Sequence, residues 1–485
     1  MIAGLKPCPV MKESGVEWLG EVPAHWDIRS LRQCGSISGG MTPSMEVPQY
    51  WNGTIPWVTP KDMKTLAIGD SRIKVTQAAV DETSLRVIGD AVVLLVVRGM
   101  ILARKVPIAW TRCPLTINQD MKAISPSEGI DARYLATLLD SARDAFFPLI
   151  DEAGHGTKRL PTERLRNIFI TVPPLEEQAA IVRYLDHVDR RVRRLVRAKR
   201  KLIALLTEQK QAIIHRAVTR GLDPDVPMKD SGVEWLGEVP AHWEVARLRN
   251  VTASVTSGSR GWSLYAADNG PLFIRVANLS RMSLDLRFDD VVRLNLPETS
   301  EVIRTRVRPG DVLLSITAYI GSVAVVPEEF EEAYVSQHVA RCEIRDGAHN
   351  PRWVGYVLLS EVGQRHGKLS LYGGTKDGIS LDDVKSYPLL LPPRQEQEQL
   401  VTEIEEKVGY IDGAIVKANR EIELLTEYRT RLTADVVTGK LDVREVAAAL
   451  PEIDPLAADD DLDTLDAEFE PELDELEAIA EDAEA

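Results

Sequence analysis

The sequence has few cysteines and no long apolar run. Its four cysteines form no C-x-x-C pair, so neither a disulfide framework nor a zinc site is predicted. No apolar run approaches the roughly 20 residues that a membrane-spanning helix needs, and residues 1–10 lack the apolar stretch of a signal peptide. We therefore expect a cytoplasmic protein that does not contact a membrane.

Common catalytic signatures are missing as well. There is no phosphate-binding G-x-x-x-x-G-K-[ST] loop, no H-E-x-x-H zinc motif and no G-x-S-x-G nucleophile elbow. The Pro-Pro pairs at 173–174 and 392–393 resemble an aminomethylation signature only superficially, because its polar anchor and aromatic residue are missing, and we interpret them as helix starts. We expect a chain without catalysis of its own that binds no cofactor or metal.

Positive charge is not in excess. The formal net charge is −16, but residues 451–485 alone hold sixteen Asp and Glu and no Lys or Arg, which leaves residues 1–450 neutral. This acidic stretch is typical of a disordered tail, and its role stays open between solubility and competition with DNA for a basic groove. Because a neutral body binds nucleic acid weakly on its own, we expect protein partners.

What the sequence does contain is a long internal repeat. Residues 11–26 return at 228–243 with fifteen matches in sixteen positions. The spacing far exceeds the roughly 20 to 50 residues of a solenoid unit, so each copy opens a whole domain. The repeated tryptophans suit the packing of a domain edge, and we expect the repeated His25 and His242 to be structural.

The far ends of the two halves also match, with Gln178 aligned to Gln397. Between the matching ends only short echoes remain, such as Gln119 with Gln337. We predict six segments, namely an N-terminal extension (1–14), a first domain (15–172), a first long helix (173–222), a second domain (223–391), a second long helix (392–440) and an acidic, disordered tail (441–485).

Each predicted long helix carries an apolar stripe at heptad spacing, along 176–220 and along 395–437, with a glycine suited to the cap at 221 or 439. Each stripe needs a partner, so we predict an antiparallel coiled-coil pair and a pseudo-two-fold axis through the duplicated chain. The first helix packs eight basic residues into 189–201 and the second is acidic, which favours pairing within the chain. A solvated face, or attraction to DNA or to a partner, remains an alternative for the basic run.

Each domain mixes strands and helices. Residues 91–97 and 311–316 are predicted to be buried strands, and residues 132–140 and 352–359 helices. The fold class is therefore α+β, or mixed α/β, with two compact domains.

Taken together, these features resemble one known family. The motif W-L-G-E-x-P-x-H-W, the segment 37–63, the G-T-K near each domain's end and the P-P-L-E-E-Q helix module are similar to the specificity subunit of type I restriction-modification systems. The resemblance implies two target-recognition domains, each reading one half of a split double-stranded DNA sequence, with the paired helices setting the spacing. It also implies assembly with two methyltransferase subunits and, in the full complex, two restriction subunits. S-adenosylmethionine, ATP and Mg²⁺ are then expected on these partner subunits and not on this chain.

Three alternatives remain open. The chain could serve a methylation-based defence system without the ATP-dependent nuclease, which neighbouring genes would decide. It could be a fused restriction enzyme with an unrecognised motif. It could also be a coiled-coil scaffold for protein ligands, which salt-dependent DNA binding by the purified assembly would exclude.

Candidate phosphate contacts come from glycine-rich turns and basic residues. The turn with Gly39, Gly40 and Thr42 allows close backbone approach to phosphate, although a plain surface turn fits as well. Lys158, Arg159 and Lys376 follow glycines that recur in both halves, which favours a shared phosphate contact over an ordinary loop.

Other candidates are chosen by side-chain chemistry. Arg304 and Arg306, followed by Arg308, alternate, so in a strand their guanidinium groups would share one face and hold phosphate or simply be solvated. Base reading must lie where the halves differ, and four residues there have donors that suit guanine or adenine edges: Arg98, Arg260, Arg275 and Asn278.

Overall fold

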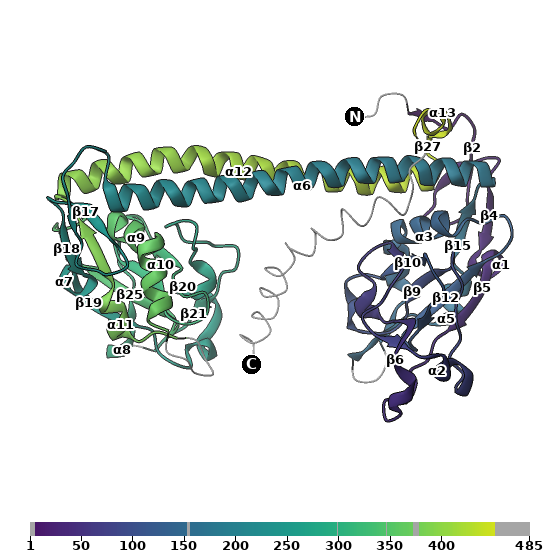
Figure 1. The fold of residues 1–485 in the computed structure, drawn as a ribbon, viewed down its shortest axis with the longest axis horizontal. Coiled ribbons are helices and arrows are strands. Elements are labelled where there is room, and N and C mark those ends of the chain that lie inside the picture. Colours follow the sequence, from purple (N-terminus) through teal and green to yellow (C-terminus); the bar gives the residue numbers. More distant parts are fainter. Residues whose placement is uncertain (1–4, 153–155, 298, 346, 372–377, 452–485) are drawn as a thin grey trace. The chain divides into compact units, whose positions relative to one another are not determined.

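The computed structural model describes residues 5–152, 156–297, 299–345, 347–371 and 378–451, and these form two compact units (Figure 1). Unit 1 draws on residues 1–197 and 422–485, and unit 2 on residues 198–421. Both mix helices and sheets, which confirms the predicted fold class. The predicted segment boundaries stay a prediction, except that disorder from residue 441 is wrong, because Leu441–Asp442 forms a paired strand and Arg444–Ala448 a helix. The rest of the predicted tail, from residue 452, lies outside the described residues.

Unit 1 is built on a five-stranded sheet of order β5-β12-β9-β10-β7 and a three-stranded sheet of order β11-β6-β8. The strands of these sheets are β5 (Gly35–Gly39), β6 (Trp51–Val58), β7 (Ala67–Ile68), β8 (Lys74–Val75), β9 (Val93–Val96), β10 (Ile108–Thr111), β11 (Thr116–Ile117) and β12 (Met121–Pro126). Every residue of β9 is buried, as the apolar run 91–97 predicted, although the strand is shorter than that run.

Further strands of unit 1 pair two by two. They are β1 (Lys6–Pro7) with β27 (Leu441–Asp442), β2 (Met11–Glu13) with β3 (Glu21–Pro23), β4 (Asp27–Ser30) with β15 (Phe169–Val172), and β13 (Asp151–Glu152) with β14 (Lys158–Arg159). Its shorter helices are α1 (Leu31–Cys34), α2 (Gln77–Glu82), α3 (Ala132–Ser141), α4 (Arg143–Phe146), α5 (Thr162–Arg166) and α13 (Arg444–Ala448). Helix α3 confirms the helix predicted at 132–140.

Unit 2 repeats this plan with sheets of order β19-β25-β22-β23 and β21-β20-β24, and with the pairs β16-β17 and β18-β26. Its strands are β16 (Met228–Asp230), β17 (Glu238–Pro240), β18 (Glu244–Arg247), β19 (Thr252–Ser257), β20 (Ala266–Ile274), β21 (Arg293–Leu294), β22 (Val312–Ser315), β23 (Val323–Val325), β24 (Ala333–Val335), β25 (Val339–Ile344) and β26 (Pro388–Leu391). Its shorter helices are α7 (Leu248–Val251), α8 (Ser300–Thr305), α9 (Pro351–Leu359), α10 (Glu361–Leu369) and α11 (Leu381–Ser386). Strand β22 and helix α9 confirm the elements predicted at 311–316 and 352–359.

Two long helices, α6 (Leu175–Arg220) and α12 (Arg394–Val437), follow the Pro-Pro pairs (Figure 1). Both helices end close to the predicted glycines, Gly221 and Gly439. These residues have φ of +70° and +77°, a left-handed conformation that ends a helix and that would strain a residue with a side chain. In unit 2, Lys199 of α6 pairs with Glu421 of α12, and Lys210 of α6 pairs with Asp412 of α12. Residue numbers rise along one helix while they fall along the other, so the helices run antiparallel there.

The apolar stripe follows the predicted heptads only in part. Leu185, Val188 and Val192 are buried, but Leu195 and Leu202 are about two fifths exposed. Towards the end of α6 the buried apolar residues are Ile214, Ala217 and Val218, whereas the heptad spacing would place Ile213 on the buried stripe. A straight α-helix drifts from a 3.5-residue repeat, so a single heptad register does not hold over 46 residues.

Opposite charges pair across the two helices, with the predicted polarity at Lys199 and Glu421 and with the reverse polarity at Asp189 and Arg429. Arg429 Nε lies 2.8 Å from Asp189 in unit 1, and Lys199 Nζ lies 2.5 Å from Glu421 in unit 2. Lys210 was not singled out from the sequence, yet its side chain is 4% exposed and donates to Asp412 at 2.6 Å. Because the Asp412 side chain is 44% exposed, only the lysine of this pair is buried, and such a pair fixes the register of paired helices more than it adds stability.

A repeated set of polar contacts anchors each domain to its long helix. In unit 1 the buried Gln178 donates to the carbonyls of Gly129 and Pro173 and accepts from the Asp131 backbone at 2.8 Å. In unit 2 the buried Gln397 accepts from the Asn350 backbone and donates to the Pro392 carbonyl, both at 2.8 Å.

The repeated tryptophan and histidine motif meets the same turn of helix. Trp26 Nε1 donates to Glu177 at 2.8 Å, and His25 Nε2 lies 2.8 Å from the other oxygen of that carboxylate. His242 and Trp243 contact Glu396 in the same way at 2.9 and 3.0 Å. The structural role predicted for these histidines is thus the one they have.

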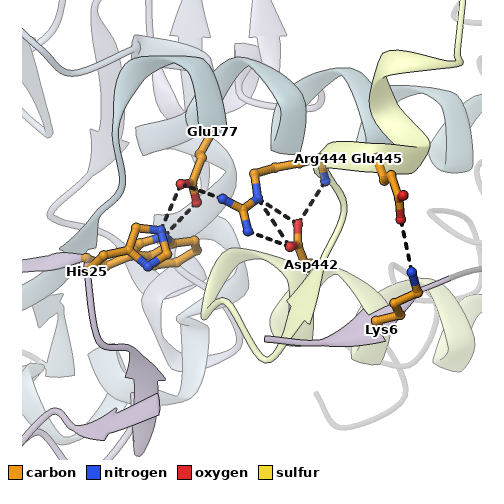
Figure 2. Close-up of polar contacts among 7 residues, drawn as sticks. Lys6, His25, Glu177, Asp442, Arg444 and Glu445 are labelled. Carbon is orange, nitrogen blue, oxygen red and sulfur yellow. Dashed lines mark hydrogen bonds and ion pairs between the residues drawn. The ribbon is translucent and has the colours of Figure 1, made fainter. Parts of the chain in front are cut away.

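Unit 1 has an additional clasp near the C-terminal end of the described chain (Figure 2). Strand β27 pairs with β1, and Lys6 Nζ lies 3.2 Å from Glu445. Arg444 binds Asp442 and also approaches Glu177 to 3.4 Å, so it joins the clasp to the start of α6. Helix α13 buries Ala447 against this region of the core.

Two predictions about whole-chain properties can be compared with the described residues. The four cysteines are free, and Cys34 and Cys342 are buried. Within the part of the chain that the structure describes, no helix is long and apolar enough to cross a membrane.

Candidate nucleic-acid interface

The candidates of unit 1 gather at one edge of its large sheet. Strand β5 ends where Gly39 faces Lys122, and β9 ends where Val96 faces Met121, so the ends of both strands flank the start of β12. Arg98 follows β9 and forms an isolated bridge to Arg159 of β14. Five sequence segments thus meet at this edge, because the backbones of β11 and β14 also join it.

Gly40 is required by a close approach between two strands. A Cβ at this position would lie 2.0 Å from the Ile117 carbonyl oxygen, and Met41 donates its amide to that oxygen at 3.1 Å. The glycine therefore permits a contact inside the domain, and the predicted approach to phosphate stays a prediction. One consequence is that the next residues are held over β11, where the Thr42 hydroxyl bonds the exposed Gln119.

Basic side chains line the other side of the edge. Arg98 and Arg159 are exposed, and Gly99 donates to the Lys158 carbonyl at 3.1 Å. Lys158 Nζ lies 2.8 Å from Glu152, and its hydrogen bond and charge hold the pKa of that carboxyl below its usual range. Exposed guanidinium groups can bind phosphate or a guanine edge, whereas Lys158 is already paired.

Unit 2 builds an equivalent edge from different side chains. Ile316 donates to the His338 carbonyl at 3.0 Å, as Val97 donates to Asp120 in unit 1 at 2.8 Å. Gly258 stands where Gly40 stands, and a Cβ there would lie 1.8 Å from the Val335 carbonyl oxygen.

Three polar side chains of unit 2 form a cluster on this edge. His338 Nδ1 lies 2.7 Å from the Thr317 hydroxyl, and His338 Nε2 lies 2.8 Å from Gln337 Nε2. His338 is exposed, while Gln337 Oε1 is buried and lacks a hydrogen-bond partner within the described residues.

Two residues predicted to read bases make contacts within unit 2. The Asn278 side chain is buried and closes a turn, since it accepts from the Arg275 amide and donates to the carbonyls of Arg287 and Asp290. Arg275 pairs with the Asp290 carboxylate at 2.6 Å. These contacts take up the Asn278 amide, whereas Arg275 Nε is buried without a hydrogen-bond partner within the described residues, so base reading by these two residues stays a prediction.

The alternating arginines do not lie on one strand. Arg304 belongs to helix α8 and donates to Thr256, whereas Arg306 follows the helix and lies 3.7 Å from Glu332. Arg308 pairs with Glu343 at 2.9 Å. The prediction of a strand with one basic face is wrong, because Thr299 caps a short helix at this point.

Of the remaining candidates, one lies in a loop and one lies outside the described residues. Arg260 is exposed in the loop after β19, near Gly258. Lys376, with Gly374 and Thr375, lies outside the described residues, as do Gly154 and His155. Among the residues that can be placed, no group of three or more His, Cys, Asp or Glu could hold a metal ion.

Sequence reasoning did not rank Gln119, Gln337, Thr317 or His338 as site residues. The signal was present, since the two glutamines recur at corresponding positions while the residues around them differ. Only the sheet register shows that Gln119 lies at the edge that holds Arg98 and Gly40, and that the other three residues lie at the corresponding edge of unit 2.

Comparison with known proteins identifies relatives along most of the chain. Residues 23–204 and 299–410, more than half of the sequence, match the family model described as type I restriction modification DNA specificity domain. The MjaIX specificity subunit of a type I restriction enzyme from Methanocaldococcus jannaschii is 26% identical over 449 residues, which cover 88% of this chain and 96% of that one.

Two further matches agree. The EcoR124I/EcoR124II specificity subunit of Escherichia coli is 34% identical over 179 residues, which cover 37% of this chain and 42% of that protein. A chain in a solved structure of a type I R-M system has a TM-score of 0.64 at 18% identity and covers 86% of this chain and 99% of its own length, so it shares the fold.

Proposed function

Because this chain belongs to the type I restriction-modification DNA specificity family, whose members recognise the DNA target and do not catalyse, we propose that it reads a bipartite target with one half-site per unit. The observation that carries the proposal is the duplicated sheet edge. Each unit presents the same backbone frame with different side chains on it, and two such frames suit two different half-sites.

The proposed assembly contains two methyltransferase subunits per specificity chain and, in the full complex, two restriction subunits. S-adenosylmethionine, ATP and Mg²⁺ bind to those partners. The named relatives are specificity subunits of type I restriction enzymes, which favours this assembly over a system without the ATP-dependent nuclease.

Exposed apolar side chains on the long helices support docking of the methyltransferase subunits. Eight of them stand on α6 and α12: Leu175, Leu195, Leu202, Leu205, Tyr410, Val416, Leu424 and Tyr428. Large apolar residues exposed along one element are typical of an interaction surface. Co-purification should give two methyltransferase subunits per chain, and a stable monomer with nanomolar site-specific binding would contradict the proposal.

Domain exchange tests bipartite reading directly. Residues 30–155 should be replaced by the corresponding region of another family member, and the methylated sequence of the host genome profiled by long-read sequencing. One half of the target should change and the other half should stay. If both halves changed, the units would not read independently.

The phosphate contacts proposed for this edge are tested by salt dependence. Arg159→Ala in the assembled complex should weaken binding to all duplexes and reduce the slope of log affinity against log salt by about 1 if it contacts phosphate, whereas Arg98→Ala should instead relax the preference at one base pair if Arg98 reads a base. The matched control Arg166→Ala removes an exposed arginine that pairs with Glu163 on α5, and it should leave the slope unchanged. An unchanged slope for Arg159→Ala and unchanged base preferences for Arg98→Ala would remove these residues from the interface.

A further inference from the structure

We propose that Gln119 and Gln337 contact base edges, one in each half of the target, and that Thr42 in unit 1 and His338 in unit 2 orient the two amides. This inference rests on the proposed function. It adds residues that the sequence did not rank and pairs them across the duplication.

The positions of the two glutamines correspond through the backbone. Gln119 follows β11 and precedes β12, and Gln337 follows β24 and precedes β25. In both units the preceding strand is pinned under a glycine, Gly40 or Gly258, at which no side chain fits. The glutamine is therefore carried by rigid backbone at the edge of the sheet, which is what precise reading of a base requires.

In unit 1 the Gln119 amide is held on one side. Its Oε1 takes the hydrogen bond of the Thr42 hydroxyl, and its side chain is exposed. A carbonyl oxygen has two lone pairs, so Oε1 can accept a second hydrogen bond while Nε2 donates. An amide that donates and accepts at once matches the N7 and N6 groups of adenine in the major groove.

In unit 2 the Gln337 amide is held through its nitrogen. A neutral imidazole has one donor and one acceptor nitrogen. If Gln337 Nε2 donates to His338 Nε2, then His338 Nδ1 carries the proton and donates to Thr317 at 2.7 Å. This chain of bonds leaves Gln337 Oε1 as the acceptor without a partner in the described part of unit 2. An unpaired buried acceptor is unfavourable, so a turn of the half-buried Gln337 side chain that brings Oε1 to a donor on a ligand is favoured.

The two sites therefore offer different groups from equivalent places. In unit 1 the oxygen of the Gln119 amide already accepts a hydrogen bond from Thr42, whereas in unit 2 the nitrogen of the Gln337 amide is hydrogen-bonded to His338. The side chains that make the difference, Thr42 and His338, stand on segments that diverge between the halves. This explains how one shared glutamine can serve two half-sites of different sequence.

The test uses the complex of the full chain with its methyltransferase subunits. Competition binding is measured with duplexes in which each base pair of the target is replaced in turn. Gln337→Ala should lose discrimination at one position of one half-site by about tenfold or more, and Gln119→Ala should do so only in the other half-site. The salt dependence should not change, because no phosphate contact is removed.

The positioning residues need a separate readout. His338→Ala should relax the same single position as Gln337→Ala, and the double variant should add nothing further, which a double-mutant cycle measures. Thr42→Val should relax the position read by Gln119, and Thr42→Ser should restore it because the hydroxyl returns. Gln399→Ala, which removes an exposed amide on α12, should leave every base preference intact.

The outcomes separate this inference from the proposed function. If the wild-type complex reads no bipartite target, the proposed function itself fails. If it does, and the glutamine variants weaken all duplexes equally or change none, only the base contacts are refuted. Thermal unfolding of each variant distinguishes a lost contact from a misfolded unit.

Discussion

Replacing Gln178 by leucine should destabilise unit 1 with little change in shape. The side chain is fully buried at the start of α6 and makes three hydrogen bonds. It accepts from the backbone of Asp131, which is also the N-cap of α3 and binds the Tyr134 amide at 2.8 Å. Leucine keeps most of the volume but none of the polar contacts.

The magnitude follows from what the substitution leaves unpaired. One backbone amide and two carbonyls lose a partner, and each buried unpaired group costs about 1–3 kcal/mol. Partial hydration and the apolar gain of leucine offset part of this cost. We therefore expect a loss of about 2–4 kcal/mol in the free energy of unfolding of unit 1.

Urea denaturation of the full chain, followed by tryptophan fluorescence, measures the effect. Gln397→Leu should destabilise unit 2 by a comparable amount, and the control Glu176→Leu adds leucine at an exposed position of the same turn. The two glutamine effects should add, because they lie in separate units. A Gln178→Leu variant within about 0.5 kcal/mol of wild type would refute the assigned role, since surface substitutions also fall in that range.

Three further predictions concern unit 2 and the long helix. Arg341→Met should cost about 3–5 kcal/mol, because it strands the Asp311 carboxylate, whose side chain is 2% exposed, and adding Asp311→Leu should recover most of the loss in urea denaturation. Burial lowers the pKa of His366 from 6.5, so the unfolded state binds the proton more readily than the folded state. The free energy of unfolding of unit 2 should therefore fall as the pH drops through 6.5. His366→Gln should make this free energy depend less on pH between pH 8 and 5. Four residues inserted after Leu202 lengthen α6 by about 6 Å with little more than one full turn, so the spacer in the methylated target should grow by one or two base pairs. An unchanged spacer would remove α6 from its proposed role as a ruler.

The scaffold was more predictable than the site because its signals are repeated. The Pro-Pro pairs, the apolar stripes at 176–220 and 395–437 and the capping glycines indicated both long helices, whose ends lie within one residue of those stripes. What they did not show is why the repeat exists. That became clear only when Glu177 and Glu396, each some 150 residues further on, proved to bind the repeated tryptophans.

The candidate site was predictable only where backbone geometry coincided with chemistry. Arg98 was chosen for its donors and lies at the edge of the sheet, whereas Arg275 and Asn278 were chosen for the same reason and bond to their own loop. A side-chain type states what a residue can bind, not what already binds it. The partner depends on contacts between distant segments, which one sequence does not reveal.

The composition of unit 1 bears on the order in which the chain folds during synthesis. Unit 2 is one continuous stretch, but unit 1 needs residues that follow it: Tyr134 and Thr171 donate to the carbonyl of Val437, and β1 pairs with β27. A ribosome releases all of unit 2 before these partners exist. Domains usually fold in the order in which they are synthesised, but here the folding of unit 1 can be completed only after all of unit 2 has been synthesised. Until α12 has been synthesised, part of the core of the nascent first domain stays exposed. A chaperone that shields apolar surface would act on the chain during this interval.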